Sequence, residues 1–276
     1  MSSLRVCVGG RPFVITRADR LVAEEHRTLQ RLASDDGNGR ELVIRLRDEP
    51  PAAPAGAPRD GEPAEITVEG DRVHVTHERF TGVITPKTYE AVIHRDPAVG
   101  ATAIEIVLRT ALSCRLPLEN GLLLHSAGII IDDRAALFFG VSGAGKSTMT
   151  EMMGGVALSD ELVAVSGDDV RATGFWGSLD RDDAPRQKFP LGALVNLGRG
   201  DGVSLSRLSV GDAARRLLLA TVVPPHPLLW SHALRVVSRL AHAPVFHLAW
   251  SPSEANAREV ATRLGREWGH SSTLSS

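Results

Sequence analysis

LLLHSAGIIIDDRAALFFGVSGAGKSTMT, residues 122–150, contains a pattern that links a strand, a loop and a helix. Two apolar runs, residues 122–131 and 135–139, are joined by a polar turn, and the second run leads directly into GVSGAGKS at 140–147. This octapeptide fits the phosphate-loop pattern G-x-x-x-x-G-K-[ST] in the structural context that the pattern requires. The sequence therefore predicts a bound nucleoside triphosphate, and the flanking residues must indicate the reaction.

The glycines of such a loop let consecutive backbone N–H groups point at the phosphates, and the following helix directs its positive end toward them. We expect Lys146 to reach the β- and γ-phosphates of the nucleotide and the Ser147 hydroxyl to bind Mg²⁺. The predicted nucleotide-binding residues are Gly140, Val141, Ser142, Gly143, Ala144, Gly145, Lys146, Ser147 and Thr148.

An acidic pair follows the loop closely, in LSDELVAV at residues 158–165, where Asp160 lies 14 residues after Lys146 and Glu161 comes next. The gap leaves room for a helix over residues 146–153 before the chain re-enters the sheet. In many phosphate-loop machines the acid follows a further strand and helix, so this spacing favours a compact kinase-like site. The alternative is that the two acids only cap the end of a strand.

Two other nucleotide-binding classes lack their signatures here. The sequence contains no L-S-G-G-Q run of a transporter ATPase and no [NT]-K-x-D run for guanine recognition, since NLGRGD at residues 196–201 has no lysine. The sequence therefore does not favour a transporter ATPase or a guanine-nucleotide-binding protein.

Three segments together resemble a known family. LLLHSAG (122–128), LFFGVSGAGKSTMT (137–150) and LSDELVAV (158–165) look like the catalytic core of the HPr kinase/phosphorylase family and, more distantly, of phosphoenolpyruvate carboxykinases. The resemblance covers residues 122–165. It implies an α/β fold with a phosphate-loop core of this type.

The resemblance also implies roles for the acidic pair. Asp160 is the candidate general base for a hydroxyl nucleophile, and Glu161 is a ligand of Mg²⁺ together with Ser147 and Asp160. The family usually shows a second aspartate at the position of Glu161. The longer side chain leaves the division of work between the two acids open.

Three more side chains are candidates for the site. The resemblance places His125 near the γ-phosphate or the metal as a catalytic residue, whereas a histidine on an apolar strand is otherwise typical of a core. Arg186 and Lys188 alternate in APRQKFP, so on a strand they would face the same side. They are candidate phosphate or substrate contacts, and the alternative is a solvated strand face.

The resemblance also limits the substrate. The sequence has no counterpart of the glycine-rich RGLGI-like segment of true HPr kinase/phosphorylases, and its first 120 residues do not look like their N-terminal domain. The chain is more similar to stand-alone HPr kinase-related proteins, among them kinases of serine on precursor peptides of ribosomally made natural products such as lasso peptides. We expect an ATP-dependent kinase for a hydroxyl, in first place a serine of a peptide or small protein.

Two alternatives stay open at this point. A small-molecule kinase acting on a sugar, polyol or amino acid would use the same site. A non-catalytic ATP-binding switch would need the loop but no base beside the γ-phosphate.

Composition excludes several classes of partner. The chain has 276 residues and a net charge of −2, so no bulk charge favours nucleic acid or an anionic membrane. Cys7 and Cys114 lie among apolar neighbours and are expected to be core thiols. No stretch predicts a targeting signal or a membrane span, so we expect a cytoplasmic protein. Whether it forms a homo-oligomer is open.

The rest of the chain supports two parts, an α+β region at residues 1–120 and the kinase core at residues 121–270. The first part has a Pro/Ala-rich loop at residues 48–63 that we expect to be mobile, and a hairpin around Gly70. The predicted strands are 4–8, 13–15, 42–46 and 245–250; the predicted helices are 23–33, 101–112, 210–221 and 228–240.

Two helix boundaries are also predicted. Pro117 is expected to stop the helix of residues 101–112. Ser251 and Glu254 form a capping box with Pro252 at the first helical position, so a last helix starts there. The tail at residues 270–276 is expected to be disordered.

Overall fold

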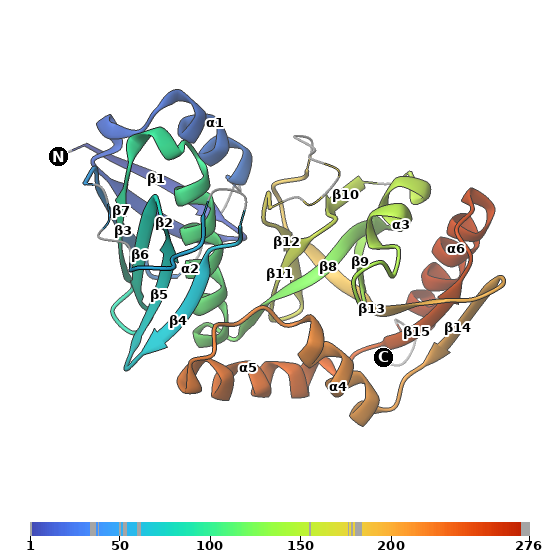
Figure 1. Ribbon diagram of the computed structural model, residues 1–276. Coiled ribbons are helices and arrows are strands. Elements are labelled where there is room, and N and C mark those ends of the chain that lie inside the picture. Colours follow the sequence, from blue (N-terminus) through green and yellow to red (C-terminus); the bar gives the residue numbers. More distant parts are fainter. Residues whose placement is uncertain are drawn as a thin grey trace. The chain divides into compact units, whose positions relative to one another are not determined.

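Figure 1 shows the computed structural model of the chain, which describes residues 2–33, 37, 39–49, 51, 54–59, 62–154, 156–175, 177, 179 and 184–271. The chain divides into two compact units. The first comprises Met1–Asn120 and Val223–Ala233, and the second comprises Gly121–Val222 and Leu234–Ser276. Parts of the expected mobile loop at 48–63 lie outside the described residues. The expected disordered tail at 270–276 begins too early, because residues 270 and 271 belong to the helix Glu254–Ser271, and the rest of it lies outside the described residues.

The described residues form a mixed α/β structure with two sheets and six α-helices, which confirms the expected α/β class. None of these helices combines the length and the apolar character needed to cross a membrane.

The first unit is built on a sheet with the strand order β1-β2-β3-β7-β6-β5-β4. Its strands β5 to β7 alternate buried and partly exposed residues, as expected for a sheet with one covered face. The elements are β1 (Ser3–Val8), β2 (Arg11–Thr16), α1 (Ala23–Leu32), β3 (Leu42–Arg47), β4 (Glu65–Glu69), β5 (Arg72–His77), β6 (Phe80–Thr85), β7 (Glu90–Arg95) and α2 (Thr102–Leu118).

Helix α2 packs on the buried face of β6 and β7. A Cβ atom on Gly82 would lie 2.8 Å from Val107 Cγ2, so a glycine lets the helix approach the sheet at this point. The predicted hairpin is confirmed, because β4 and β5 are antiparallel and Gly70 turns the chain at a φ of 61°.

The expected stop at Pro117 is wrong, because α2 continues to Leu118 with the proline inside its last turn. The N–H of Glu119 donates to the carbonyl oxygens of Arg115 and Leu116, at 3.3 and 3.0 Å, and closes that turn. Pro117 cannot donate a hydrogen bond within the helix, and α2 ends one residue after it.

The second unit contains the sheet order β10-β8-β11-β12-β13-β15-β14, with β9 paired to both β13 and β8. Strands β9, β13 and β15 are parallel to one another, so their carboxyl ends lie at one edge. The elements are β8 (Gly121–Ile131), β9 (Arg134–Phe139), α3 (Lys146–Met153), β10 (Val156–Ser159), β11 (Leu162–Ser166), β12 (Asp169–Ala172), β13 (Phe189–Arg199), β14 (Val203–Arg207), α4 (Val210–Ala220), β15 (Val245–Trp250) and α6 (Glu254–Ser271). Helix α5 (Pro227–Leu240) is shared, because its residues up to Ala233 belong to the first unit and those from Leu234 to the second.

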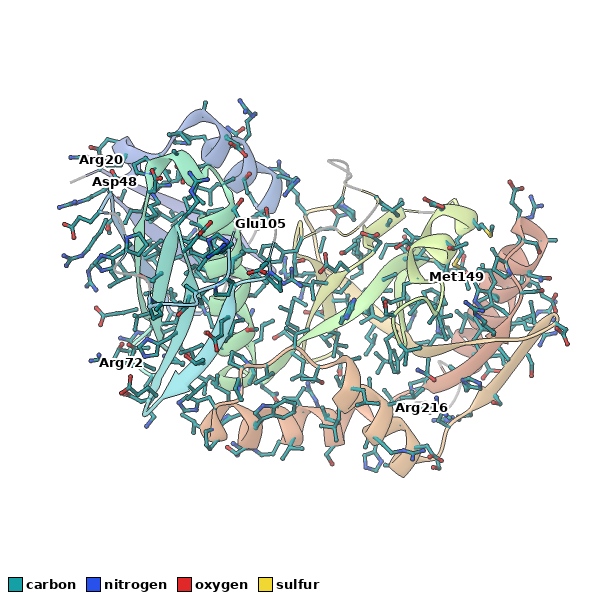
Figure 2. The ribbon with its side chains drawn as sticks, in the orientation of Figure 1. Arg20, Asp48, Arg72, Glu105, Met149 and Arg216 are labelled. Carbon is teal, nitrogen blue, oxygen red and sulfur yellow. The ribbon has the colours of Figure 1, made fainter. Side chains whose placement is uncertain are left out.

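Helices α3 and α6 lie side by side and cover one face of β9, β13 and β15 (Figure 1). Met149 of α3, labelled in Figure 2, is fully buried in this core with Phe138, Trp250 and Leu264. The predicted helix at residues 146–153 is confirmed. Its packing fixes the helix that follows the glycine loop.

The predicted start of the last helix is displaced. Helix α6 begins at Glu254, and the N–H of Asn256 donates to Ser253 Oγ at 3.1 Å, so Ser253 is the N-cap. Ser251 instead accepts hydrogen bonds from the Asn256 side chain, at 2.8 Å on its carbonyl oxygen and 2.9 Å on Oγ. Pro252 therefore precedes the helix, because Ser253, which lies closer to the first turn than Ser251, caps it.

Candidate functional site

A cavity of about 510 Å³ opens in the second unit beside the glycine loop. Its wall comes from the loop and the first turn of α3, from β8, and from the bend between β10 and β11. The lining residues are His125, Ser142, Gly143, Gly145, Lys146, Ser147, Thr148, Asp160, Glu161 and Gly177.

Six of the nine predicted nucleotide-binding residues line this cavity, and Gly140, Val141 and Ala144 do not. Gly143 and Gly145 adopt φ angles of 76° and 95°, which side chains rarely tolerate. The loop thereby turns from the end of β9 into the amino end of α3. The positive end of that helix faces the cavity, as anion binding requires.

Lys146 is the first residue of α3 and is buried, with 9% of its surface exposed. Its Nζ donates to the carbonyl oxygen of Gly140 at 3.4 Å. Burial lowers the pKa of Lys146 below its usual range, and the negative charges of Glu161 and Asp160 oppose that shift. The ammonium group is thus held at the cavity wall close to two carboxylates.

The acidic pair lies where β10 ends and β11 begins, both antiparallel to β8. The buried Ser159 shapes this bend. Its Oγ accepts hydrogen bonds from the N–H groups of Glu161 and Leu162, both at 3.0 Å, and donates to the carbonyl oxygen of Phe175 at 2.8 Å. Because the chain turns here, both acids face the cavity and do not alternate across the sheet.

Asp160 is held at both carboxylate oxygens. Its Oδ2 accepts a hydrogen bond from Ser147 Oγ at 2.9 Å, and its Oδ1 accepts one from the N–H of Gly177 at 2.8 Å. The residue has only 3% of its surface exposed. A Cβ on Gly177 would lie 3.2 Å from Oδ2, which is closer than an ordinary van der Waals contact. A direct hydrogen bond therefore joins Asp160 to Ser147 of the glycine loop.

His125 lies on β8, opposite Leu162 of β11, and its side chain is exposed. It lines the cavity with Lys146 and the two acids. The alternative interpretation as a core histidine is therefore wrong.

Arg186 and Lys188 do not belong to this wall. Both are exposed and precede β13, so the expected strand does not include them. Lys188 Nζ pairs with Asp169 Oδ2 at 2.7 Å on the surface. Two exposed cations in an irregular segment need not face one side, which is why the alternation did not predict their position.

Sequence analysis missed two residues of the site, Ser159 and Gly177. A serine directly before an acidic pair is a signal for a side-chain-stabilised turn, and it was available. Gly177 had no signal beyond that of a turn, because its contact with Asp160 joins segments 17 residues apart.

Behind the loop, the buried Asn196 of β13 connects two elements. Its Nδ2 donates to the carbonyl oxygen of Phe139 at 3.5 Å, directly before the glycine loop. Arg216 of α4, labelled in Figure 2, donates from Nη1 to Asn196 Oδ1. This contact supports the end of β9, from which the loop starts.

The donor set suits a hard cation that keeps other ligands. Within the described part of the chain, no group of three or more His, Cys, Asp or Glu side chains is arranged to hold a metal by itself. Ser147 and the two acids offer only oxygen atoms, and Mg²⁺ in proteins is commonly bound by one or two carboxylates with phosphates and water. The residues therefore fit Mg²⁺ that arrives with a nucleotide.

Two other cavities lie in the first unit. One, of about 460 Å³, includes Arg45, Arg47 and Arg72 on the outer sheet face, where Arg45 Nη2 pairs with Glu90 Oε1 at 2.7 Å. The other, of about 640 Å³, includes His77, whose Nε2 lies 3.2 Å from the carbonyl oxygen of Arg59. Neither combines a glycine loop, a buried lysine and an acid.

Comparison with protein-family models and with curated proteins finds no match to this chain. The resemblance to HPr kinase-related proteins therefore rests on the three sequence segments and stays a prediction.

Proposed function

We propose that this protein is an ATP- and Mg²⁺-dependent kinase that transfers the γ-phosphoryl group to a hydroxyl, in first place a serine of a peptide or small protein. One observation carries the proposal. The hydrogen bond between Ser147 Oγ and Asp160 Oδ2 joins the glycine loop to the acidic pair at a cavity that Lys146 and His125 also line. Phosphoryl transfer needs this combination of a phosphate cradle, a cation and carboxylates.

The residues of the cavity account for the steps of transfer. The loop N–H groups and Lys146 bind and orient the phosphates, and Ser147 with Asp160 would hold Mg²⁺. Bound Mg²⁺ would neutralise charge that develops on the phosphoryl oxygens. His125 lines the same cavity, where an imidazole can hydrogen-bond the transferring group. A carboxylate of the pair takes the proton of the acceptor hydroxyl.

The choice of a peptide as the acceptor is the more specific part of the proposal. It is supported by the segments that resemble HPr kinase-related proteins. A small-molecule kinase would use the same cavity, and an ATP-binding switch would use the loop alone.

The test incubates the protein with Mg²⁺ and γ-labelled ATP. The acceptors are serine-containing peptides encoded beside its gene, and a panel of sugars, polyols and amino acids. Label on a peptide serine, lost in Lys146→Ala and kept in the exposed control Lys87→Ala, is the expected result. Label on a small molecule and on no peptide would indicate that the acceptor is a small molecule of that chemical class. Tight ATP binding with no labelled acceptor would favour the switch and contradict the kinase.

A further inference from the structure

A hollow of about 460 Å³ lies in the first unit on strands β3, β5, β6 and β7. We infer that it docks an acidic, partly apolar segment of the peptide acceptor, separate from the serine that receives the phosphoryl group. The acceptor role rests on the kinase function proposed above, whereas the binding of an acidic peptide does not. The residues that carry the inference, called the arginine hollow below, are Arg45, Arg47, Arg72, Val83 and Val92.

The arginine hollow lies on the sheet face that helix α2 does not cover. On β3, Arg45 and Arg47 are exposed and Leu46 between them is buried. On β6 and β7, Val83 and Val92 are half-buried, while their neighbours along each strand are buried. Successive side chains of a strand point to opposite faces, and α2 packs against the buried ones. The arginines and the valines therefore share the outer face.

Strand pairing places arginines on both sides of the two valines. Val92 of β7 is the register partner of Arg45 on β3 and of Val83 on β6. The strand order is β3-β7-β6-β5, so Arg72, the first residue of β5, lies on the other flank. Arg72 is exposed and is labelled in Figure 2. The hollow thus combines an apolar centre with guanidinium groups on two flanks.

Positive charge exceeds negative charge in the arginine hollow. Its lining holds three arginines and one carboxylate, that of Glu90. Arg45 Nη2 pairs with Glu90 Oε1 at 2.7 Å. Among the residues that the structure describes, Arg47 and Arg72 have no carboxylate oxygen at ion-pair distance. Two guanidinium groups are therefore open to an anionic partner, although the whole chain has a net charge of −2.

The chemistry of the hollow selects an acidic peptide. Guanidinium groups bind carboxylates through paired hydrogen bonds. Single exposed ion pairs contribute little, so several must act together with the burial of apolar surface, which Val83 and Val92 offer. A segment that mixes Asp or Glu with apolar residues supplies both. A nucleic acid would bring far more negative charge, which the net charge of the chain opposes.

The arginine hollow is a place for recognition and not for transfer. Within the described residues its lining includes neither a lysine nor a glycine loop, and the candidate site lies in the second unit. Contacts that bind the ground state and the transition state equally lower KM without raising kcat. Loss of the hollow should therefore raise KM for the peptide and leave kcat and MgATP binding unchanged.

The experiment reverses the charge of the hollow in the full chain with the double variant Arg47→Glu/Arg72→Glu. The control, Arg27→Glu/Arg235→Glu, reverses two exposed arginines of α1 and α5 and changes the net charge equally. The probe is a fluorescein-labelled synthetic peptide of glutamate, valine and serine, compared with the same peptide carrying glutamine for glutamate. Fluorescence anisotropy measures binding without ATP, and circular dichroism establishes that each variant is folded.

The wild type should bind the glutamate peptide at least about tenfold more tightly than the glutamine peptide, and added salt should weaken this binding. Affinity should fall at least about tenfold in Arg47→Glu/Arg72→Glu and less than about twofold in the control. Arg47→Lys/Arg72→Lys, which keeps both charges, should retain most of the affinity. With the peptide acceptor that the wild type labels, KM should rise about tenfold in the glutamate variant while kcat stays within about threefold.

Equal binding of the two peptides, or equal binding of the glutamate peptide to the wild type and to Arg47→Glu/Arg72→Glu, would overturn the inference. Binding of a single-stranded oligonucleotide or of phosphatidylserine vesicles, and not of the peptide, would assign the hollow to that partner instead. A peptide that both proteins label with the same KM would overturn the acceptor role and leave the kinase function standing. Wild-type protein that binds the glutamate peptide and labels no peptide would contradict the peptide-kinase function, while docking of an acidic peptide would stand.

Discussion

At the scale of single residues, the burial of Lys146 is expected to lower the stability of the nucleotide-free protein and to favour binding of a triphosphate. Its ammonium group is buried before any phosphate arrives, and burial lowers its pKa. The charged form is therefore less stable in the folded protein than in water. A bound triphosphate would supply the missing negative charge.

We expect Lys146→Met to weaken ATP binding by at least about 100-fold while raising the melting temperature of the nucleotide-free protein by about 2 °C, the shift that less than 1 kcal/mol gives in a domain of this size. Thermal unfolding with and without MgATP measures both effects. Lys87→Met, at an exposed position, is the control and should change neither. A variant that melts below the wild type without ATP would contradict this account.

The same residue predicts a pH dependence. A lysine with a lowered pKa in the folded state destabilises the protein below that pKa, and the penalty disappears as pH rises through it toward the usual value near 10.4. The difference in melting temperature between Lys146→Met and the wild type should therefore shrink between neutral pH and pH 10.4. A difference that grows over this range would exclude burial as its cause.

At the scale of elements, the bend between β10 and β11 depends on Ser159. Ser159→Ala leaves two N–H groups and one carbonyl oxygen without their partner in a buried place. We expect a loss of about 1–3 kcal/mol in the free energy of unfolding. We also expect lower transfer activity, because both acids follow this serine. Urea unfolding and a transfer assay measure the two effects.

The control for Ser159→Ala is Ser231→Ala. Ser231 Oγ donates to the carbonyl oxygen of Leu228 on an exposed helix surface, at 2.8 Å. Its loss should change stability by less than about 0.5 kcal/mol. Equal losses in the two variants would mean that Ser159 does not shape the bend.

The start of α6 gives a second prediction for an element. Ser253→Ala removes the N-cap and should lower the free energy of unfolding by about 1 kcal/mol. Ser251→Ala removes only the hydrogen bond that Asn256 Nδ2 donates to Ser251 Oγ. The one that Nδ2 donates to the carbonyl oxygen of residue 251 stays, so this variant should lower the free energy of unfolding by less. Denaturant titrations of the two variants compare them directly, and the reverse order would support the capping box that the sequence predicted.

At the scale of the whole molecule, the two units have separate sources of stability. In the first unit, the fully buried Arg95 pairs with Glu25, donates from Nη2 to the carbonyl oxygen of Arg20 at 3.1 Å, and lies 3.3 Å from Asp48 Oδ1 at its Nε. Arg20 and Asp48, both labelled in Figure 2, pair at 3.4 Å. This network ties α1 to β7 and the end of β3.

Arg95→Met should destabilise the first unit by about 3–5 kcal/mol, because it leaves Glu25 buried without its counter-charge. All residues of the candidate site lie in the second unit, so ATP affinity should stay within about threefold at a temperature where the variant is folded. Hydrogen exchange resolved by segment, with ATP titration, measures both. The double variant Glu25→Leu with Arg95→Met should recover part of the stability.

Local patterns were sufficient for most of the elements. Apolar runs predicted β8, β9 and β15 almost to the residue, because such runs mark buried strands. The spacing between the glycine loop and the acidic pair predicted α3. They failed at Pro117, Pro252 and the segment of Arg186 and Lys188. In these places the outcome depends on a single cap, one hydrogen bond or a surface contact, and no periodicity reports these.

The sequence by itself determined the glycine loop, the helix after it and the presence of two acids a short distance downstream, because glycine φ angles and short spacing constrain the backbone. Only the tertiary structure decided that Asp160 bonds Ser147 and Gly177 while Glu161 stays partly exposed in the cavity. Adjacent acids are equivalent in a sequence. They become different when strand pairing, the Ser159 bend and a distant glycine bury Asp160 and leave Glu161 partly exposed.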